Sequence, residues 1–233
     1  MPSREAIVAE FSGQVPEQWG MEVDGVVLRT ASAGIALTFD ACGGPHGSDY
    51  DEALVATLLD TGTPATLFLN SRWIEANPAT TRALAANPLF ELANHGTRHV
   101  PLSVTGNQAY GITGTASVAE LYDEVAENQE LLTGLMGTPP RFFRSGTAHL
   151  DDVAAQVVRA MGLVPVNFDV NADAGATFSA SQVYTATTAA TAGSISIGHV
   201  NQPGSGTAAG IAQAIPALRE AGASFVTLGE ALA

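Results

Sequence analysis

The stretch Ile35-Ala36-Leu37-Thr38-Phe39-Asp40 is an apolar run that ends on a carboxylate, which is typical of a buried strand with a functional side chain at its end. Other short apolar runs fall at 65–69, 89–93, 141–144, 163–168, 194–197 and 224–227. Helical patterns separate them at 53–59, 72–86, 117–136, 151–161, 181–192 and 207–221. Strands alternating with helices predict an α/β fold with a mostly parallel sheet, and seven or so such units predict a closed or nearly closed barrel.

No low-complexity tract or linker interrupts the 233 residues. We therefore expect residues 1–33 to be a loosely structured lead-in and residues 34–233 to form one catalytic domain. The segment Met1–Ala9 has one Arg, one Glu and no long apolar stretch, so we do not expect it to be a signal peptide. No run approaches the roughly 18 apolar residues of a membrane span.

The charge balance argues against nucleic acid as a partner. The chain has 9 Arg and Lys against 23 Asp and Glu, a formal net charge of −14. Phosphate binding needs clustered positive charge, which this composition does not offer. Cys42 is the single cysteine, so an intrachain disulfide and a zinc cluster built of several cysteines are both excluded.

Polar side chains stand directly after several of the expected strands: Asp40, His95, Arg144, Asp169 and His199. In a βα barrel the carboxyl ends of the strands meet at one face, and that face carries the active site. Each residue also has a plain structural alternative: a capping Asp, a hydrogen-bonded buried His, or an ion-paired Arg. Their recurrence at strand ends favours an enzyme.

The segment His95-Gly96-Thr97-Arg98-His99 places two imidazoles four residues apart. On a helix such positions share a face, so both rings can bind one metal ion. Taken alone, the spacing also fits two polar loop histidines. Two His ligands need a third donor, usually a carboxylate, and leave positions for water and substrate.

Four motifs together resemble the polysaccharide deacetylases of carbohydrate esterase family 4. Thr38-Phe39-Asp40 looks like the first family motif, and Asn94–His99 looks like the second, the metal-binding pair. Phe143-Arg144-Ser145-Gly146 resembles the third, and Ile197-Gly198-His199 resembles the fifth. The resemblance runs from about Gly34 to the C-terminus, and the order of the motifs makes it specific.

This resemblance implies a distorted (β/α) barrel and a metal-dependent N- or O-deacetylase. By the family pattern, Asp40 is the general base and His199 is the general acid. His95 and His99 hold a divalent metal, usually zinc, to which Asp40 is a further candidate ligand. Arg144 holds Asp40 in place, and backbone N–H groups near Gly146 and Thr147 complete an oxyanion hole.

The chain departs from the family at the third metal ligand. The first motif normally has a second Asp, and here that position is Ala41. Asp40 itself or a water can fill the gap, or another side chain can do so; the candidates are Cys42, His46, Asp169 and Asp173. Ser145 replaces the usual Pro of the third motif, and no Trp stands in the fourth, since the two tryptophans lie at Trp19 and Trp73.

The leading hypothesis is a deacetylase acting on an acetylated carbohydrate, such as peptidoglycan, chitin-like oligomers or acetylated xylan. One alternative keeps the fold and changes the bond: a C–N hydrolase of a small cyclic amide. Another is a non-catalytic glycan-binding relative that lost its metal through Ala41. Because such polysaccharides lie outside the membrane, the substrate class predicts an extracellular or cell-envelope location.

Overall fold

The computed structural model describes residues 1–233, and strand β2 (Ile35–Ala41) is buried along its whole length, as its apolar sequence predicts. The chain forms two compact units. The first comprises Met1–Val27, Leu69–Arg72 and Ala93–Asn167. The second comprises Leu28–Phe68, Trp73–Leu92 and Phe168–Ala233.

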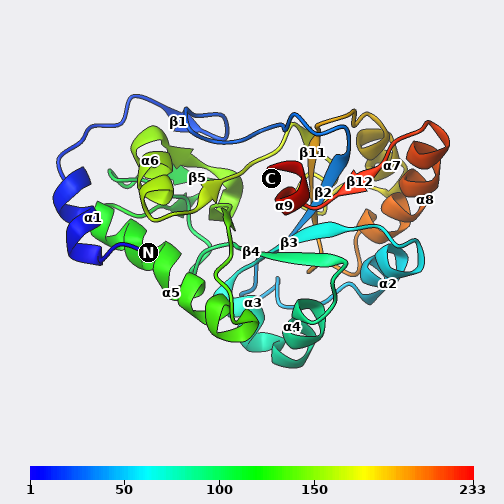
Figure 1. Ribbon diagram of the computed structural model, residues 1–233, viewed down its shortest axis with the longest axis horizontal. Coiled ribbons are helices and arrows are strands. Elements are labelled where there is room, and N and C mark those ends of the chain that lie inside the picture. Colours follow the sequence, from blue (N-terminus) through cyan, green and yellow to red (C-terminus); the bar gives the residue numbers. More distant parts are fainter. The chain divides into compact units, whose positions relative to one another are not determined.

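The main sheet has eight strands. Besides β2 these are β3 (Ala65–Leu69), β4 (Phe90–Asn94), β7 (Phe142–Phe143), β9 (Val164–Pro165), β10 (Val170–Asn171), β11 (Ile195–His199) and β12 (Phe225–Val226). In the second unit β11 pairs in parallel with both β10 and β2, and β12 pairs in parallel with β2 (Figure 1). In the first unit β7 pairs in parallel with β9 and with the end of β4. The predicted α/β fold with a parallel sheet is confirmed.

Helices cover the strands of the second unit. They are α2 (Glu52–Asp60), α4 (Pro78–Ala85), α7 (Ala180–Thr188), α8 (Thr207–Glu220) and α9 (Leu228–Ala231), and most of α3 (Ser71–Ala76) also belongs here. The helix α8 packs against both α7 and α2 (Figure 1). The predicted start of α2 is confirmed, because the Asp51 carboxylate accepts the N–H of Leu54 at 3.0 Å.

The first unit is built on three helices, α1 (Arg4–Phe11), α5 (Val118–Met136) and α6 (Asp152–Ala160). Two small antiparallel pairs accompany them, β1 (Trp19–Gly20) with β8 (Leu150–Asp151) and β5 (Gln108–Ala109) with β6 (Ile112–Thr113). The helix α5 agrees with its predicted span. Ser117 caps its first turn, and Gly137 ends it with φ +73°, a left-handed conformation that glycine adopts without strain.

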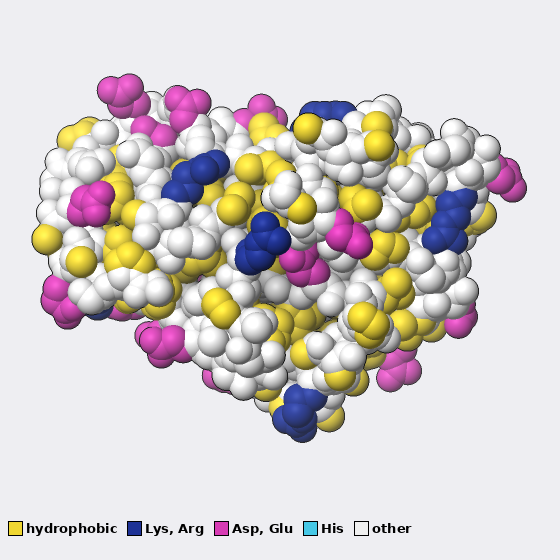
Figure 2. Space-filling view, in the orientation of Figure 1, with side chains coloured by type: hydrophobic (Ala, Val, Ile, Leu, Met, Phe, Trp, Pro, Cys, Tyr) yellow, Lys and Arg dark blue, Asp and Glu magenta, His cyan; other side chains and the backbone are white.

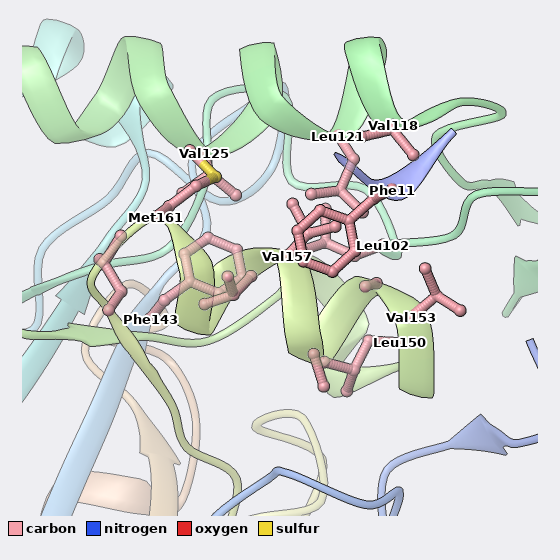
Figure 3. Packing of buried hydrophobic residues seen from close by; sticks show 14 of the residues in the cluster. Phe11, Leu102, Val118, Leu121, Val125, Phe143, Leu150, Val153, Val157 and Met161 are labelled. Atoms are coloured by element: carbon pink, nitrogen blue, oxygen red, sulfur yellow. The ribbon is translucent and has the colours of Figure 1, made fainter. Parts of the chain in front are cut away.

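The expectation of a loosely structured lead-in is wrong. Residues 4–11 form α1, whose Ile7 and Phe11 are buried in the hydrophobic core of the first unit. Figure 3 shows Phe11 beside Leu121 of α5 and near Val157 of α6. A bidentate ion pair from Arg4 to Asp123 also joins α1 to α5, at 2.7 and 2.9 Å. The helix was missed because it is short and its amphipathic pattern is weak, so packing on α5 is what stabilises it.

The predicted strand over 163–168 is shorter, since β9 ends at Pro165. Beyond it the chain pairs with Val27 through a single bridge, in which the N–H of Asn167 donates to the Val27 carbonyl at 2.9 Å. The predicted helix over 181–192 likewise ends earlier, at Thr188. The short strands β1, β5, β6, β8 and β10 carry too few residues for a hydrophobic period, so the sequence did not predict them.

One face of the molecule shows dispersed charge (Figure 2). Acidic and arginine side chains alternate there with apolar and neutral atoms, and no cationic patch is continuous. None of the helices combines the length and the apolar character that a membrane crossing requires.

Candidate functional site

Asp40 and His199 lie side by side in the second unit. They end the neighbouring parallel strands β2 and β11, and they are partners in the pairing register. The N–H of Val200 donates to the carbonyl of Asp40 at 3.0 Å, which continues this pairing past the strand ends. Asp40 is 3% exposed, so the buried end of β2 holds it beside His199 of the neighbouring strand. The predicted base and acid are therefore neighbours.

Asp173 holds the His199 ring. The Nδ1 atom of His199 lies 2.9 Å from Oδ1 of Asp173, and the backbone N–H of His199 donates to Oδ2 at 2.7 Å. The Thr207 hydroxyl donates to the same Oδ2 at 3.0 Å. Because Asp173 is completely buried and accepts three donors, it fixes the orientation of the ring through Nδ1 and directs Nε2 away from itself.

These contacts also set the charge of the pair. Burial works to lower the pKa of His199, but hydrogen bonds with Asp173 and with Cys42 outweigh it and hold that pKa well above its usual value. Burial likewise works to raise the pKa of Asp173, and the hydrogen bond and charge of His199 reverse this, so the pKa lies below its usual value. Both shifts favour the form in which an imidazolium faces a carboxylate, and an imidazolium can donate a proton.

In the first unit, His95 and His99 stand in a loop after β4. The loop is not helical, so the helical geometry expected for the pair is wrong. Left-handed backbone at Gly96 (φ +75°) and His99 (φ +60°) turns the chain instead. The two rings then meet edge to face, with centroids 4.8 Å apart. Two imidazoles this close can bind one metal ion, and their role as metal ligands stays a prediction.

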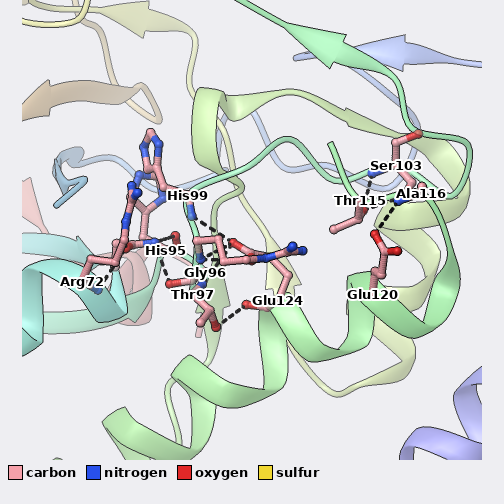
Figure 4. Close-up of polar contacts among 12 residues, drawn as sticks. Arg72, His95, Gly96, Thr97, His99, Ser103, Thr115, Ala116, Glu120 and Glu124 are labelled. Atoms are coloured by element: carbon pink, nitrogen blue, oxygen red, sulfur yellow. Dashed lines mark hydrogen bonds and ion pairs between the residues drawn. The ribbon is translucent and has the colours of Figure 1, made fainter. Parts of the chain in front are cut away.

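Glu124 of α5 anchors this loop from below (Figure 4). Its buried carboxylate accepts the backbone N–H groups of Thr97, Arg98 and His99 at 3.0–3.1 Å. A Cβ atom at Gly96 would lie 2.6 Å from Oε1 of Glu124, so glycine is required there for the close approach as well as for its φ. The loop that carries both histidines is thus held by one carboxylate.

The tautomer of His95 follows from a single contact. Its Nδ1 lies 2.9 Å from the backbone carbonyl of Arg144, and a carbonyl can only accept. Nδ1 therefore carries the proton, and the lone pair of Nε2 is available to a metal. Metal-binding histidines are commonly oriented by such a contact, so His95 and His99 fit a metal ligand pair.

Arg144 follows β7, as predicted, and is 1% exposed. Its guanidinium donates to the carbonyls of Val166 and Asn167 at 3.2 and 3.1 Å. The chain then turns sharply: Thr147 and Ala148 are left-handed, and a Cβ at Gly146 would fall 2.3 Å from the carbonyl carbon of His99. The segment after Arg144 thus packs directly on the histidine loop. That Arg144 orients Asp40, and that the backbone amides near Gly146 and Thr147 form an oxyanion hole, stay predictions.

Two of the four side chains considered as substitutes for the missing ligand have structural partners instead. Asp169 binds the Arg29 guanidinium, the Ser194 hydroxyl and the N–H of Ile195. Asp173 orients His199. Of the other two, His46 is exposed, and Cys42 is partly buried and hydrogen-bonded to His199. The second unit therefore brings Asp40, Asp173, Cys42 and His199 together.

Sequence reasoning missed two residues of the site. Glu124 lies within the amphipathic pattern of a long helix, and nothing in one sequence distinguishes it from the other acids of that helix. Asp173 was considered only as a metal ligand, and its role appears once β10 and β11 are paired and bring its segment next to His199.

Comparison with known proteins points to one family and one fold. Residues 29–166 match the family model described as polysaccharide deacetylase. The Bc1960 peptidoglycan N-acetylglucosamine deacetylase is 23% identical, with a TM-score of 0.74, 89% of this chain and 92% of that chain covered.

A family 4 carbohydrate esterase from Streptomyces lividans, in complex with acetate, is 24% identical, with a TM-score of 0.69 and coverage of 85% and 94%. A CE4 family pseudoenzyme from Bacillus anthracis is 18% identical, with a TM-score of 0.73 and coverage of 88% and 68%. These likenesses confirm the expected fold class, the α/β fold of the polysaccharide deacetylase type.

Proposed function

The chain belongs to the polysaccharide deacetylase family, and from this premise we propose that it is a metal-dependent hydrolase of acetyl groups on an N- or O-acetylated carbohydrate. The substrate class we propose is a peptidoglycan, chitin-like or xylan-like glycan. The observation that supports it best is the pairing of Asp40 with a His199 that Asp173 orients and keeps protonated.

In this proposal Asp40 is the base and His199 is the acid. Asp40 accepts a proton from the attacking water as the water adds to the acetyl carbonyl carbon. His199 then donates the proton on Nε2 to the leaving nitrogen or oxygen of the sugar. Asp173 keeps the imidazolium in place and stabilises its charge until that transfer.

His95 and His99 are the proposed metal ligands, with the proton of His95 held on Nδ1 by the carbonyl of Arg144 and the lone pair on Nε2. Asp40 or Cys42 is the proposed third donor. A bound divalent ion, which in this family is usually zinc, would polarise the acetyl carbonyl and lower the pKa of the attacking water. Arg144 is proposed to orient Asp40, and the amides near Gly146 and Thr147 to stabilise the developing oxyanion.

Acetate release from a panel of acetylated glycans tests the function. The panel should hold chitin oligomers, peptidoglycan fragments and acetylated xylo-oligosaccharides, with the metal content of the protein measured in parallel. We expect Asp40→Asn and His199→Ala each to lower turnover by about 10²–10⁴-fold while the fold survives. His46→Ala is the matched control, because that histidine is exposed in the same unit.

Near-normal turnover in both catalytic variants would contradict the assignment. His95→Ala is expected to lose the metal, and active protein without any metal would contradict the metal-dependent part alone. The proposed site of action is the cell envelope or the extracellular space, where these glycans lie.

A second candidate function is supported by Ala41. With the usual carboxylate missing, the chain can be a glycan-binding relative without catalysis, and one structural neighbour is named a pseudoenzyme. Glycan binding without acetate release, in protein supplied with zinc, would favour this candidate over the deacetylase.

A further inference from the structure

Three aromatic rings from separate segments lie together in the first unit: Trp19 of β1, Tyr110 at the tip of the β5–β6 hairpin, and His149 just before β8. The His149 ring contacts both of the others, with its centroid 5.9 Å from that of Trp19 and 5.3 Å from that of Tyr110. We call these three residues the aromatic cluster. Because they come from three distant parts of the sequence, no single sequence pattern predicts that they lie together.

Tyr110 has an exposed side chain and a left-handed backbone, neither of which packing against the rest of the protein explains. It is 77% exposed, although it is a large aromatic residue. Tyr110 and Gly111 form the two-residue tip of the hairpin with φ of +52° and +75°, the left-handed values of a tight hairpin turn. Asn-Gly suits such a turn, whereas tyrosine is disfavoured at positive φ. The hairpin therefore presents an exposed ring at a cost in backbone conformation.

The other two rings are fixed by backbone contacts. Nδ1 of His149 lies 2.7 Å from the carbonyl of Thr147, and the His149 carbonyl accepts the Ser145 hydroxyl and the N–H of Leu102. Trp19 is placed by the pairing of β1 with β8, where it stands opposite Asp151. The cluster is thus preorganised, which lowers the entropic cost of binding a ligand to it.

The cluster adjoins the histidine loop within the same unit. His149 ends the segment that begins at Arg144, and Gly146 in that segment packs on the backbone of His99. The side chain of Thr147, in the same turn, has a buried hydroxyl oxygen without a hydrogen-bond partner. Aromatic faces with a few polar groups between them are the usual composition of a small-molecule site.

We infer that Trp19, Tyr110 and His149 form a binding site for a pyranose ring of a glycan chain, beside the unit that reacts. A sugar ring offers apolar C–H faces that pack on aromatic rings and hydroxyl groups that pair with Nε2 of His149. The inference rests on the proposed carbohydrate substrate and adds that the protein binds more than one sugar unit.

Binding of a chitin hexamer to the full-length Asp40→Asn protein tests the site without turnover. Isothermal titration calorimetry measures the affinities, because one of the variants removes Trp19 and the other tryptophan, Trp73, is completely buried. We expect Trp19→Ala and Tyr110→Asn each to weaken hexamer binding about two- to tenfold, the range of one aromatic contact, and to leave binding of single N-acetylglucosamine unchanged. Tyr110→Phe should retain the hexamer affinity.

Tyr110→Asn separates ligand binding from folding. Asparagine favours the left-handed turn, so the melting temperature should be unchanged or higher while glycan affinity falls. Tyr184→Ala is the matched control, because Tyr184 is 37% exposed on α7 in the second unit. An acetylated xylo-oligosaccharide of similar length is tested in the same way.

The outcomes separate the two proposals. If acetate is released from the oligomers and the cluster variants keep the wild-type KM, the inference is wrong and the deacetylase stands. If the oligomers bind through the cluster but no acetate is released, the deacetylase fails and the inference stands. If neither oligomer binds, the inference is overturned.

Discussion

Replacing Glu124 with Gln changes one atom beneath the histidine loop. In the wild-type protein Oε1 accepts the backbone N–H groups of Thr97, Arg98 and His99, and Oε2 accepts the N–H and Nε of Arg98. Glutamine keeps a single carbonyl oxygen and places an NH₂ group at the position of the other. Donors then face donors in a buried site, and the negative charge that attracted them is gone.

The expected cost follows from these contacts. A buried donor left without an acceptor costs about 1–3 kcal/mol, and a hydrogen bond to a charged group contributes about 1.5–3 kcal/mol. The salt bridge to Arg98 adds little, because that side chain is 56% exposed. We therefore expect Glu124→Gln to lower the free energy of unfolding by about 3 kcal/mol and the melting temperature by about 6–12 °C.

The same variant should weaken zinc binding about tenfold, in the range for loss of a group that supports metal ligands. Thermal unfolding and calorimetric zinc titration of the full chain measure the two effects. Glu127→Gln is the control, since it makes the same change at an exposed position of the same helix. A Glu124→Gln protein that melts and binds zinc like the wild type would refute the anchoring role of this carboxylate.

Three further predictions follow from single contacts. Asp173→Asn removes the partner that raises the pKa of His199, so the alkaline limb of the pH–rate profile should move to lower pH. The raised pKa of His199 stabilises the folded protein fully at pH values below the pKa of an unfolded histidine. The lowered pKa of Asp173 stabilises it fully at pH values above the pKa of an unfolded aspartate. The wild type should therefore exceed this variant in stability most between about pH 4 and pH 6.5, which urea unfolding measures. Phe11→Ala should lower the free energy of unfolding by about 3–5 kcal/mol, whereas Val15→Ala, at a position 80% exposed, should change it by less than about 0.5 kcal/mol, both measured by chemical denaturation. Ala41→Asp should raise the zinc affinity measured by calorimetry, and an unchanged affinity would show that position 41 does not reach the metal.

Hydrophobic period predicts the long elements well. The run at 35–40 is a strand because every residue of β2 is buried, and the helix at 117–136 agrees in both ends because a capping Ser and a left-handed Gly mark them. Polar residues at strand ends also predict their neighbours, since parallel strands bring Asp40 and His199 to the same edge. These are local signals that the sheet then brings together.

The conformations of the loops could not be predicted in the same way. The histidine pair meets through left-handed backbone at Gly96 and His99, not through a helical turn, and that conformation depends on Glu124, 25 residues further along the chain. The helix at residues 4–11 depends on packing against α5, so its own weak amphipathic pattern carries no signal. Long-range contacts made by single residues produce no periodic hydrophobic pattern, so the sequence alone does not predict them.

The loss of the family carboxylate at Ala41 can be reconciled with the retained acid–base pair through the chemistry of the neighbouring donors. Asp40 adjoins His199 through the strand register, and Cys42 adjoins it through a side-chain hydrogen bond, so both flank the same imidazole. If Asp40 serves as the metal ligand, the protein needs another base, whereas with a thiolate ligand from Cys42 the Asp40 carboxylate can be the base that accepts the proton of water. Thiolate with two imidazoles is a donor set that zinc favours and magnesium disfavours. If Cys42 replaces the lost ligand, the deacetylase mechanism therefore needs no base other than Asp40. Stronger binding of zinc than of magnesium would then indicate that replacement.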